Sequence, residues 1–300
     1  MKAWLHQTRD SIKLLLSGYG KVLFLASCIA AFSVAAYTIV FHASPRTLRV
    51  SFLDIGQGDS IFIQTPSGHD MLIDGGPSDT VLEKLHDKMS YFDRDLDVVI
   101  ATHGDADHVT GLIPVFEQYD VKRFVKSPIE AQTGIFDDLL SHITDEGAEV
   151  YVGKKGDVID FGDGVVAYIL YPNKNISTKT ETNDASVSVV VTYGKQSFLL
   201  TGDLGTKFEP ELIQSVLPKD VTVYKAGHHG SKYSSGEQLL TYIKPEYAVI
   251  SAGKDNKYGH PNPEAVERLQ KYSKEILSTI HRGTITFVTD GRLIEVETEK

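Results

Sequence analysis

The sequence predicts a layered α/β domain in which two β-sheets pack face to face with helices outside, preceded by an apolar N-terminal segment. Short β-branched runs alternate with helical stretches in two successive cycles over residues 47–300, the pattern of sheets covered by helices. No break in composition divides this region into separate domains. Several apolar runs end in histidine or aspartate, and the ends of central strands commonly carry the active site of such folds.

Residues 22–41 carry no charge. A helix of this length spans about 30 Å, which matches the hydrocarbon core of a bilayer, so we expect a transmembrane helix or signal anchor. Four basic residues precede it and only Arg46 and Arg49 follow closely, which predicts a single-pass protein with residues 1–21 in the cytoplasm and the body outside the cell. The open alternatives are a cleaved signal peptide, which would release a secreted body, a lipoprotein signal ending at Cys28, and a buried core helix.

Charge and cysteine content restrict the function of the body. Cys28 is the only cysteine and lies in the apolar segment, so residues 47–300 can form no disulfide. These residues include 25 basic and 39 acidic side chains, a formal charge of −14. This charge argues against tight binding of a nucleic acid, although a local basic patch near Lys225 and Lys232 is compatible with it.

The first cycle is expected to contain an antiparallel meander, a helix, a central strand and a second helix. In order, these are strands over residues 48–53, 60–64 and 71–73, a helix over 78–91, a strand over 96–102 and a helix over 109–118. The loop THGDADH therefore follows the end of a central strand. His103, Asp105, Asp107 and His108 offer four metal ligands within six residues of this loop, and neutral imidazole with carboxylate suits Zn or Mn.

The second cycle repeats this arrangement. We expect strands over residues 158–161, 165–171, 186–192, 196–201, 221–225, 246–251 and 284–288, and helices over 204–216, 236–243 and 263–274. Three of the strands lead into further polar residues, namely Asp203, the pair His228 and His229, and His260. Together with residues 103–108, these clusters share a position at or just beyond strand ends, which indicates one common site.

The ordered series HGDADH, TGD, HHGS and GHP, preceded by FLDIGQGDS and IDGG, resembles the metallo-β-lactamase fold. Within that family it is most similar to the C-terminal domain of ComEC-type competence proteins and their stand-alone relatives, here in a membrane-anchored form. The resemblance covers about residues 47–297. It implies an αββα sandwich over residues 47–300, with a site for one or two divalent metal ions at one rim.

The resemblance also implies a role for each motif residue. His103 and Asp105 would bind the first metal ion, Asp107 and His108 the second, and Asp203 would bridge both. One of His228 and His229 would complete the second site and the other would reach the substrate phosphate, because neighbours in an extended segment point to opposite sides. His260 would be a general acid or phosphate contact. The residues expected to take part in catalysis would thus be Asp107, Asp203 and His260. The other expected substrate contacts are Asn183, Ser186, Ser231 and Lys232, and the residues expected to support the loops are Asp54, Gln57, Asp59 and Asp74.

The sequence departs from the commoner His-x-His-x-Asp-His form of the motif. Asp105 stands where a histidine is usual, and Asn183 and Ser186 lie where the family has a third histidine. Because oxygen donors replace nitrogen donors, the first site is expected to prefer Mn over Zn.

These residues predict a metal-dependent hydrolase that uses a metal-activated water, because no Gly-x-Ser-x-Gly motif or cysteine of the body offers a nucleophile. The resemblance favours an extracellular phosphodiesterase or DNase. One alternative is a hydrolase of a small or cell-envelope phosphodiester, such as a phosphorylcholine ester, or of another ester. Another is a metal-binding protein without catalytic activity. The sequence identifies no protein partner.

Overall fold

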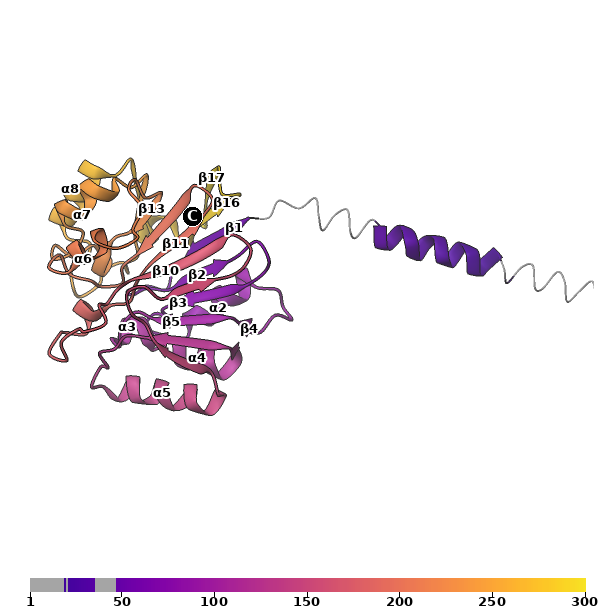
Figure 1. Ribbon diagram of the computed structural model, residues 1–300, viewed down its shortest axis with the longest axis horizontal. Coiled ribbons are helices and arrows are strands. Elements are labelled where there is room, and N and C mark those ends of the chain that lie inside the picture. Colours follow the sequence, from indigo (N-terminus) through magenta and orange to yellow (C-terminus); the bar gives the residue numbers. More distant parts are fainter. Residues whose placement is uncertain (1–18, 20, 36–46) are drawn as a thin grey trace, which may run out of the picture. The chain divides into compact units, whose positions relative to one another are not determined.

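The computed structural model describes residues 19, 21–35 and 47–300 (Figure 1). Residues 21–35 are helical, and Thr47–Lys300 form a compact unit. The transmembrane helix expected over residues 22–41 is not found, since no helix among the described residues is both long and apolar enough to cross a bilayer. Residues 36–46, and the expected cytoplasmic segment apart from residues 19 and 21, lie outside the described residues.

One sheet of the compact unit has eight strands. They are β1 (Leu48–Phe52), β2 (Ile61–Gln64), β3 (Asp70–Ile73), β5 (Val98–Ala101), β7 (Arg123–Lys126), β8 (Glu149–Val152), β16 (Ile285–Thr289) and β17 (Ile294–Thr298). Their order is β17-β16-β1-β2-β3-β5-β7-β8. The expected antiparallel meander is β1 to β3, whereas β3, β5, β7 and β8 run parallel.

The other large sheet has seven strands. They are β9 (Val158–Asp160), β10 (Val165–Tyr171), β11 (Ser188–Tyr193), β12 (Gln196–Leu200), β13 (Val223–Lys225), β14 (Tyr247–Ile250) and β15 (Glu275–Ser278), and they lie in the reverse of this order. The pairs from β9 to β12 are antiparallel and those from β12 to β15 are parallel. A separate short ladder joins β4 (Asp95–Leu96) to β6 (Asp120–Val121).

Helices cover the outer faces of the two sheets, which gives the expected αββα arrangement (Figure 1). The helices beside the first sheet are α2 (Thr80–Lys88), α3 (Ala106–Val109), α4 (Leu112–Gln118) and α5 (Gly134–Glu146). Those beside the second are α6 (Glu209–Ile213), α7 (Glu237–Ile243), α8 (Pro263–Tyr272) and α9 (Thr279–Arg282). Apolar side chains on both faces of the strands cause this layering, as β5 illustrates. Val98 and Ile100 belong to the core between the sheets, and Val99 and Ala101 belong to the core beneath the helices.

Several parts of the expected element order differ from the structure, and β15, α9 and β17 were not predicted. The helix expected over residues 204–216 is only α6, because Pro210 lacks an N–H and fits only the first turn of a helix. No strand or helix was predicted for the segment that forms β7, α5 and β8. Helix α5 nevertheless carries local signals, since Thr133 caps its N-terminus and Gly147 ends it in the left-handed conformation with φ of 82°.

The parallel strands direct several loops to one end of the two sheets. Strand β5 ends before His103, β12 before Asp203, β13 before His228 and His229, and β14 before Gly253. The carboxyl ends of adjacent parallel strands lie along the same edge of a sheet. Polar residues far apart in the sequence therefore meet there.

Candidate metal centre

The loop between β5 and α3 carries four of the expected ligands. His103 follows β5 closely, and Asp107 and His108 lie on α3, which begins at Ala106. Both histidines are buried, whereas the side chains of Asp105 and Asp107 are 39% and 24% exposed. The loop therefore presents two imidazoles to the interior and keeps two carboxylates in contact with solvent.

Asp203, three residues beyond β12, has four imidazoles around one of its oxygens. Its Oδ2 lies 3.4 Å from Nε2 of His108, 3.5 Å from Nε2 of His229, 3.6 Å from Nε2 of His228 and 4.0 Å from Nε2 of His103. The Asp203 carboxylate is buried. It therefore lies among the histidines that were predicted as metal ligands.

The two carboxylates of the α3 loop approach different histidines. Oδ2 of Asp105 lies 3.9 Å from Nε2 of His103, and Oδ2 of Asp107 lies 3.4 Å from Nε2 of His229. The structure thus brings together both groups of ligands that the sequence assigned to two ions. It also favours His229 over His228 as the second histidine of the Asp107 group, because only His229 contacts that carboxylate in the described chain.

The His228–His229 segment is not extended, contrary to expectation. Both residues have left-handed backbone angles, with φ of 49° and 54°, within the turn Gly227–Gly230. Consecutive side chains of such a turn need not point to opposite sides, and both Nε2 atoms approach Asp203. The His228 side chain is 31% exposed and that of His229 is buried. Of the pair, His228 is therefore the histidine in contact with solvent.

Hydrogen bonds at Nδ1 fix the orientation of two buried imidazoles. Nδ1 of His229 donates to the carbonyl oxygen of Ser251 at 3.0 Å, and Nδ1 of His108 lies 2.8 Å from Oδ2 of Asp74. The Asp74 carboxylate also accepts from the backbone N–H and hydroxyl of Thr102. A proton held at Nδ1 leaves Nε2 of each ring free to bind a cation. Asp74 thus links His108 to Thr102 at the start of the same loop.

Burial and neighbouring charges shift the pKa values of the donors in different directions. Burial alone would lower the pKa of His108 and His229, but Asp203 and the other nearby carboxylates raise both, that of His229 to about 9, so a cation must displace protons from these two rings. Burial lowers the pKa of His103 to about 4, which favours its neutral imidazole. Burial alone would raise the pKa of the Asp203 carboxyl, but His229, His108 and Lys225 hold that pKa well below its usual value. Asp203 therefore remains a carboxylate.

Lys225 is a buried charged residue next to Asp203 that was not predicted to lie there. Nζ of Lys225 contacts Asp59, lies 3.2 Å from the carbonyl oxygen of Gly202 and is 3.7 Å from Oδ1 of Asp203. Its side chain is fully buried, so Lys225 cannot belong to the surface basic patch expected near Lys232. The sequence signal for it was a lysine directly after the strand-forming run VTVY. A charge buried at the end of a strand must be paired, because burying an unpaired charge is costly.

Asp59 lies deeper in the centre than a loop-supporting residue was expected to lie. The preceding Gly58 has φ of +136°, and a side chain there would collide with the backbone of Asp107, so the GQGD turn packs directly on α3. Ligand atoms of Asp59, His108, Asp203 and His229 all lie within 4.8 Å of one another, close enough to hold one ion. We nevertheless assign Asp59 to Lys225, since the ammonium already contacts this carboxylate.

The donor set fits a divalent cation. Nε2 of His103 and Oδ1 of Asp203 are buried without a hydrogen-bond partner among the described residues. Buried polar atoms are rarely left unpaired unless a water or an ion satisfies them. Imidazole nitrogens with carboxylate oxygens are ligands for both Zn and Mn, so the set does not distinguish these metals.

Two of the predicted substrate contacts are instead internal. The hydroxyl of Ser186 is buried, donates to the carbonyl oxygen of Asn183 at 2.7 Å and accepts from the backbone N–H of Asp203. Ser231 is buried, and its hydroxyl accepts from the backbone N–H of Tyr233. Ser186 and Ser231 therefore hold loops in place and are not available to a substrate.

The remaining predicted residues divide between the rim and the periphery of the centre. His260 lies beside His228, with ring centroids 5.3 Å apart. Lys232 is exposed on the turn after His229. Oε1 of Gln57 accepts from the backbone N–H of Gly253, which joins two loops, whereas Asp54 pairs with Lys300 at 3.0 Å and does not contact the centre.

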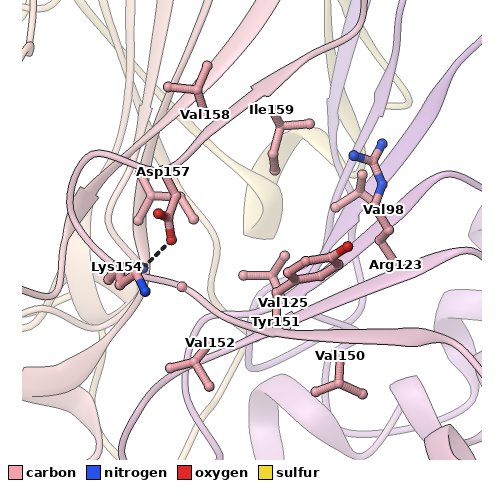
Figure 2. A pocket seen from close by; sticks show the side chains of 12 residues that line it. Val98, Arg123, Val125, Val150, Tyr151, Val152, Lys154, Asp157, Val158 and Ile159 are labelled. Atoms are coloured by element: carbon pink, nitrogen blue, oxygen red, sulfur yellow. Dashed lines mark hydrogen bonds between the residues drawn. The ribbon is translucent and has the colours of Figure 1, made fainter. Parts of the chain in front are cut away.

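A cavity of about 530 Å³ opens beside the centre. Its lining includes Gln57, Asp105, Asp107, Lys257 and Tyr258. A different cavity, of about 500 Å³, lies between β7 and β8 of one sheet and β9 and β10 of the other. Figure 2 shows the side chains that line that second cavity, which include none of the predicted site residues. Of these two cavities, the first is the one lined by predicted site residues.

Comparison with known proteins agrees with this geometry. Residues 53–254 match the family model of the metallo-beta-lactamase superfamily. The chain is 32% identical over 262 residues to ComE operon protein 3 of Bacillus subtilis, covering 81% of this chain and 33% of that protein. It is 29% identical over 265 residues to Recombination protein 2 of Haemophilus influenzae, covering 86% and 31%. The chain spans about a third of the length of these relatives.

The resemblance to ComEC-type competence proteins is thus confirmed. Among solved structures, CmlA, a diiron beta-hydroxylase from Streptomyces venezuelae, aligns with a TM-score of 0.51 at 12% identity, covering 81% of this chain and 54% of that chain. At this identity the alignment is evidence for the fold alone.

Proposed function

We propose that this chain, which belongs to the metallo-beta-lactamase superfamily, is a metal-dependent phosphodiesterase that cleaves DNA. The observation that carries the proposal is the position of four imidazole Nε2 atoms within 4.0 Å of one carboxylate oxygen of Asp203. Imidazole nitrogens gathered around a carboxylate oxygen form the mixed nitrogen and oxygen donor set that binds a divalent cation.

The ligands would divide into two groups that share Asp203. His103 and Asp105 would hold one divalent ion, and Asp107, His108 and His229 a second. When bound, such ions supply Lewis acidity, which increases the acidity of water and stabilises negative charge on a phosphoryl oxygen. Because the first group is rich in oxygen donors, we propose Mn as the ion it prefers.

Residues of the chain would orient the substrate around these ligands. Asp74 and the Ser251 carbonyl hold the protons at Nδ1 of His108 and His229, so neither ring can turn away from Asp203. The exposed edge of His228 can donate a hydrogen bond to a phosphate oxygen. His260, beside it, would donate a proton to the leaving-group oxygen.

Two observations favour DNA as the substrate. The relatives include proteins named for competence and for recombination, which suggests a nucleic acid. The lining of the cavity beside the centre also includes Lys257, whose ammonium can neutralise a phosphate bound there.

A small or cell-envelope phosphodiester, such as a phosphorylcholine ester, is the second candidate. The formal charge of −14 over residues 47–300 favours it, because broad electrostatic attraction of a polyanion is weak. The cavity of about 530 Å³ is large enough for such a ligand.

One assay separates these functions. The full chain is incubated with Mn²⁺ or Zn²⁺ and either single-stranded DNA or bis-p-nitrophenyl phosphate, and products are quantified. We expect DNA cleavage that Asp203→Asn abolishes and Asp87→Asn, on the exposed face of α2, does not change. Cleavage of the small ester alone would support the second candidate, and bound metal without turnover would identify a metal-binding protein.

A further inference from the structure

Two exposed tyrosines lie on the loops that carry histidines of the centre. Tyr233 is 68% exposed and follows His229 by four residues, and Tyr258 is 50% exposed and precedes His260 by two. An aromatic ring left in solvent contributes little to folding, since its apolar faces remain hydrated. Both rings are therefore open to solvent, on loops that also carry histidines of the centre.

Hydrogen bonds hold both tyrosine-bearing loops against each other. Asn262 follows His260 by two residues and bonds to the loop that carries Tyr233. Its side-chain oxygen accepts from the backbone N–H of Lys232 at 2.8 Å, and its backbone N–H donates to the carbonyl oxygen of Gly230. Arg268 donates to the carbonyl oxygens of Lys232 and Ser234, both at 2.9 Å. The rings therefore project from loops of fixed shape, which reduces the entropy lost when a ligand binds.

The ring of Tyr258 connects the cavity to the metal centre. It stacks on the imidazole of His260, with centroids 5.9 Å apart and planes 23° apart, and His260 in turn contacts His228. Tyr258 also lines the cavity that contains Asp105 and Asp107. A chain of contacts through His260 and His228 therefore connects the ring of Tyr258 to Asp203.

Each tyrosine has an ammonium beside it. Nζ of Lys257 lies 5.0 Å from the ring centroid of Tyr258, and Nζ of Lys232 lies 5.2 Å from that of Tyr233. An aromatic face next to a cation is the combination that binds a nucleotide, because the ring stacks on the base and the cation pairs with the phosphate.

We propose that Tyr258 and Tyr233 stack on unpaired bases of a nucleic acid strand whose phosphodiester lies at the metal centre, so the site takes a single strand in preference to a duplex. The proposal rests on the proposed function, which makes DNA the ligand. In a duplex the base faces are already stacked on one another and cannot contact the rings. Since residues 47–300 carry a formal charge of −14, stacking supplies the affinity that a basic surface provides elsewhere.

The test measures binding separately from cleavage. The full chain, kept metal-free with EDTA, is titrated against a fluorescent oligo(dT) strand and against an abasic strand of equal length, and Kd is read from anisotropy. Tyr258→Ala and Tyr233→Ala are each expected to raise Kd for oligo(dT) roughly 5- to 100-fold. Neither should change Kd for the abasic strand, and Tyr258→Trp should restore binding of oligo(dT).

The matched control is Tyr91→Ala, which removes a ring that is 67% exposed in the turn before β4 and should leave both Kd values unchanged. Circular dichroism confirms the fold of each variant. Equal Kd values for the two strands in the wild type, or equal losses on both strands in the tyrosine variants, would overturn the stacking role. Cleavage of oligo(dT) with Mn²⁺ is measured in parallel and decides the proposed function on its own, because base-dependent binding requires no turnover.

Discussion

Nζ of Lys225 lies 3.7 Å from Oδ1 of Asp203, and both side chains are buried. The same ammonium contacts Asp59, so one cation is shared by two carboxylates beneath the centre. This arrangement leaves Oδ2 of Asp203 directed at the histidines. Lys225 therefore balances charge within the fold and fixes the orientation of the proposed bridging ligand.

Replacing Lys225 tests this charge balance. Lys225→Met removes the ammonium beside the buried Asp59 and Asp203 carboxylates and leaves the histidines as their remaining counter-charges, which should lower the free energy of unfolding by about 3–5 kcal/mol. Urea denaturation of the metal-free protein measures the loss. Adding Asp59→Asn to Lys225→Met should recover part of it, and an unchanged denaturation midpoint in Lys225→Met would contradict the assignment.

Asp74 is expected to act on metal affinity through His108. Asp74→Asn keeps the shape and tolerates the positive φ of 60°, but its amide weakens the bonds to His108 and Thr102. We expect roughly 10- to 100-fold weaker binding of Mn²⁺, measured by isothermal titration calorimetry. Asp87→Asn serves as the control. Wild-type affinity in Asp74→Asn would show that the imidazole needs no such support.

Asp70, on β3, predicts a pH-dependent stability. Burial raises the pKa of this carboxyl from 3.8 to about 7, and the charges of Asp93 and Asp97 add to that effect. Between these two values the folded state holds a proton that the unfolded state has lost, so this group makes stability fall as pH rises, by at most about 1.36 kcal/mol per pH unit. Asp70→Asn should flatten this decline in urea titrations between pH 4 and 7. The same slope in both proteins would refute the buried protonated carboxyl.

Metal should stabilise the folded chain. A ligand that binds only the native state adds about 2.7 kcal/mol at a free concentration of 100 times its Kd. We therefore expect Mn²⁺ to raise the urea midpoint of the wild type relative to EDTA. Asp203→Asn should show a much smaller difference, because it replaces the oxygen around which four imidazoles lie. An equal shift in both proteins would place the bound metal elsewhere.

The sequence predicted the layers and most of the centre because both depend on local patterns. The buried run VVIA specifies a central strand, and the motif after it places His103 and His108 at the strand end. Parallel pairing of β12 with β13 then brings Asp203 and His229 into the same site. None of these steps requires knowledge of side-chain packing.

Features that depend on tertiary contacts were not predicted. The ion pair of Lys225 with Asp59 joins β13 to the loop before β2, and no local pattern encodes it. Ser186 was taken as a substrate contact, yet it is buried by packing against Asp203 and Asn183. The exposed edge strand β8 was missed because all four of its residues are exposed and show no alternation of apolar and polar side chains.

Anomalous X-ray diffraction from crystals grown with Mn²⁺ tests the central claim most directly. The account predicts a Mn peak at a coordination distance of about 2.0–2.3 Å from Nε2 of His108, Nε2 of His229 and Oδ2 of Asp203. A protein saturated with Mn²⁺ that shows its anomalous peaks only away from these three atoms would contradict it.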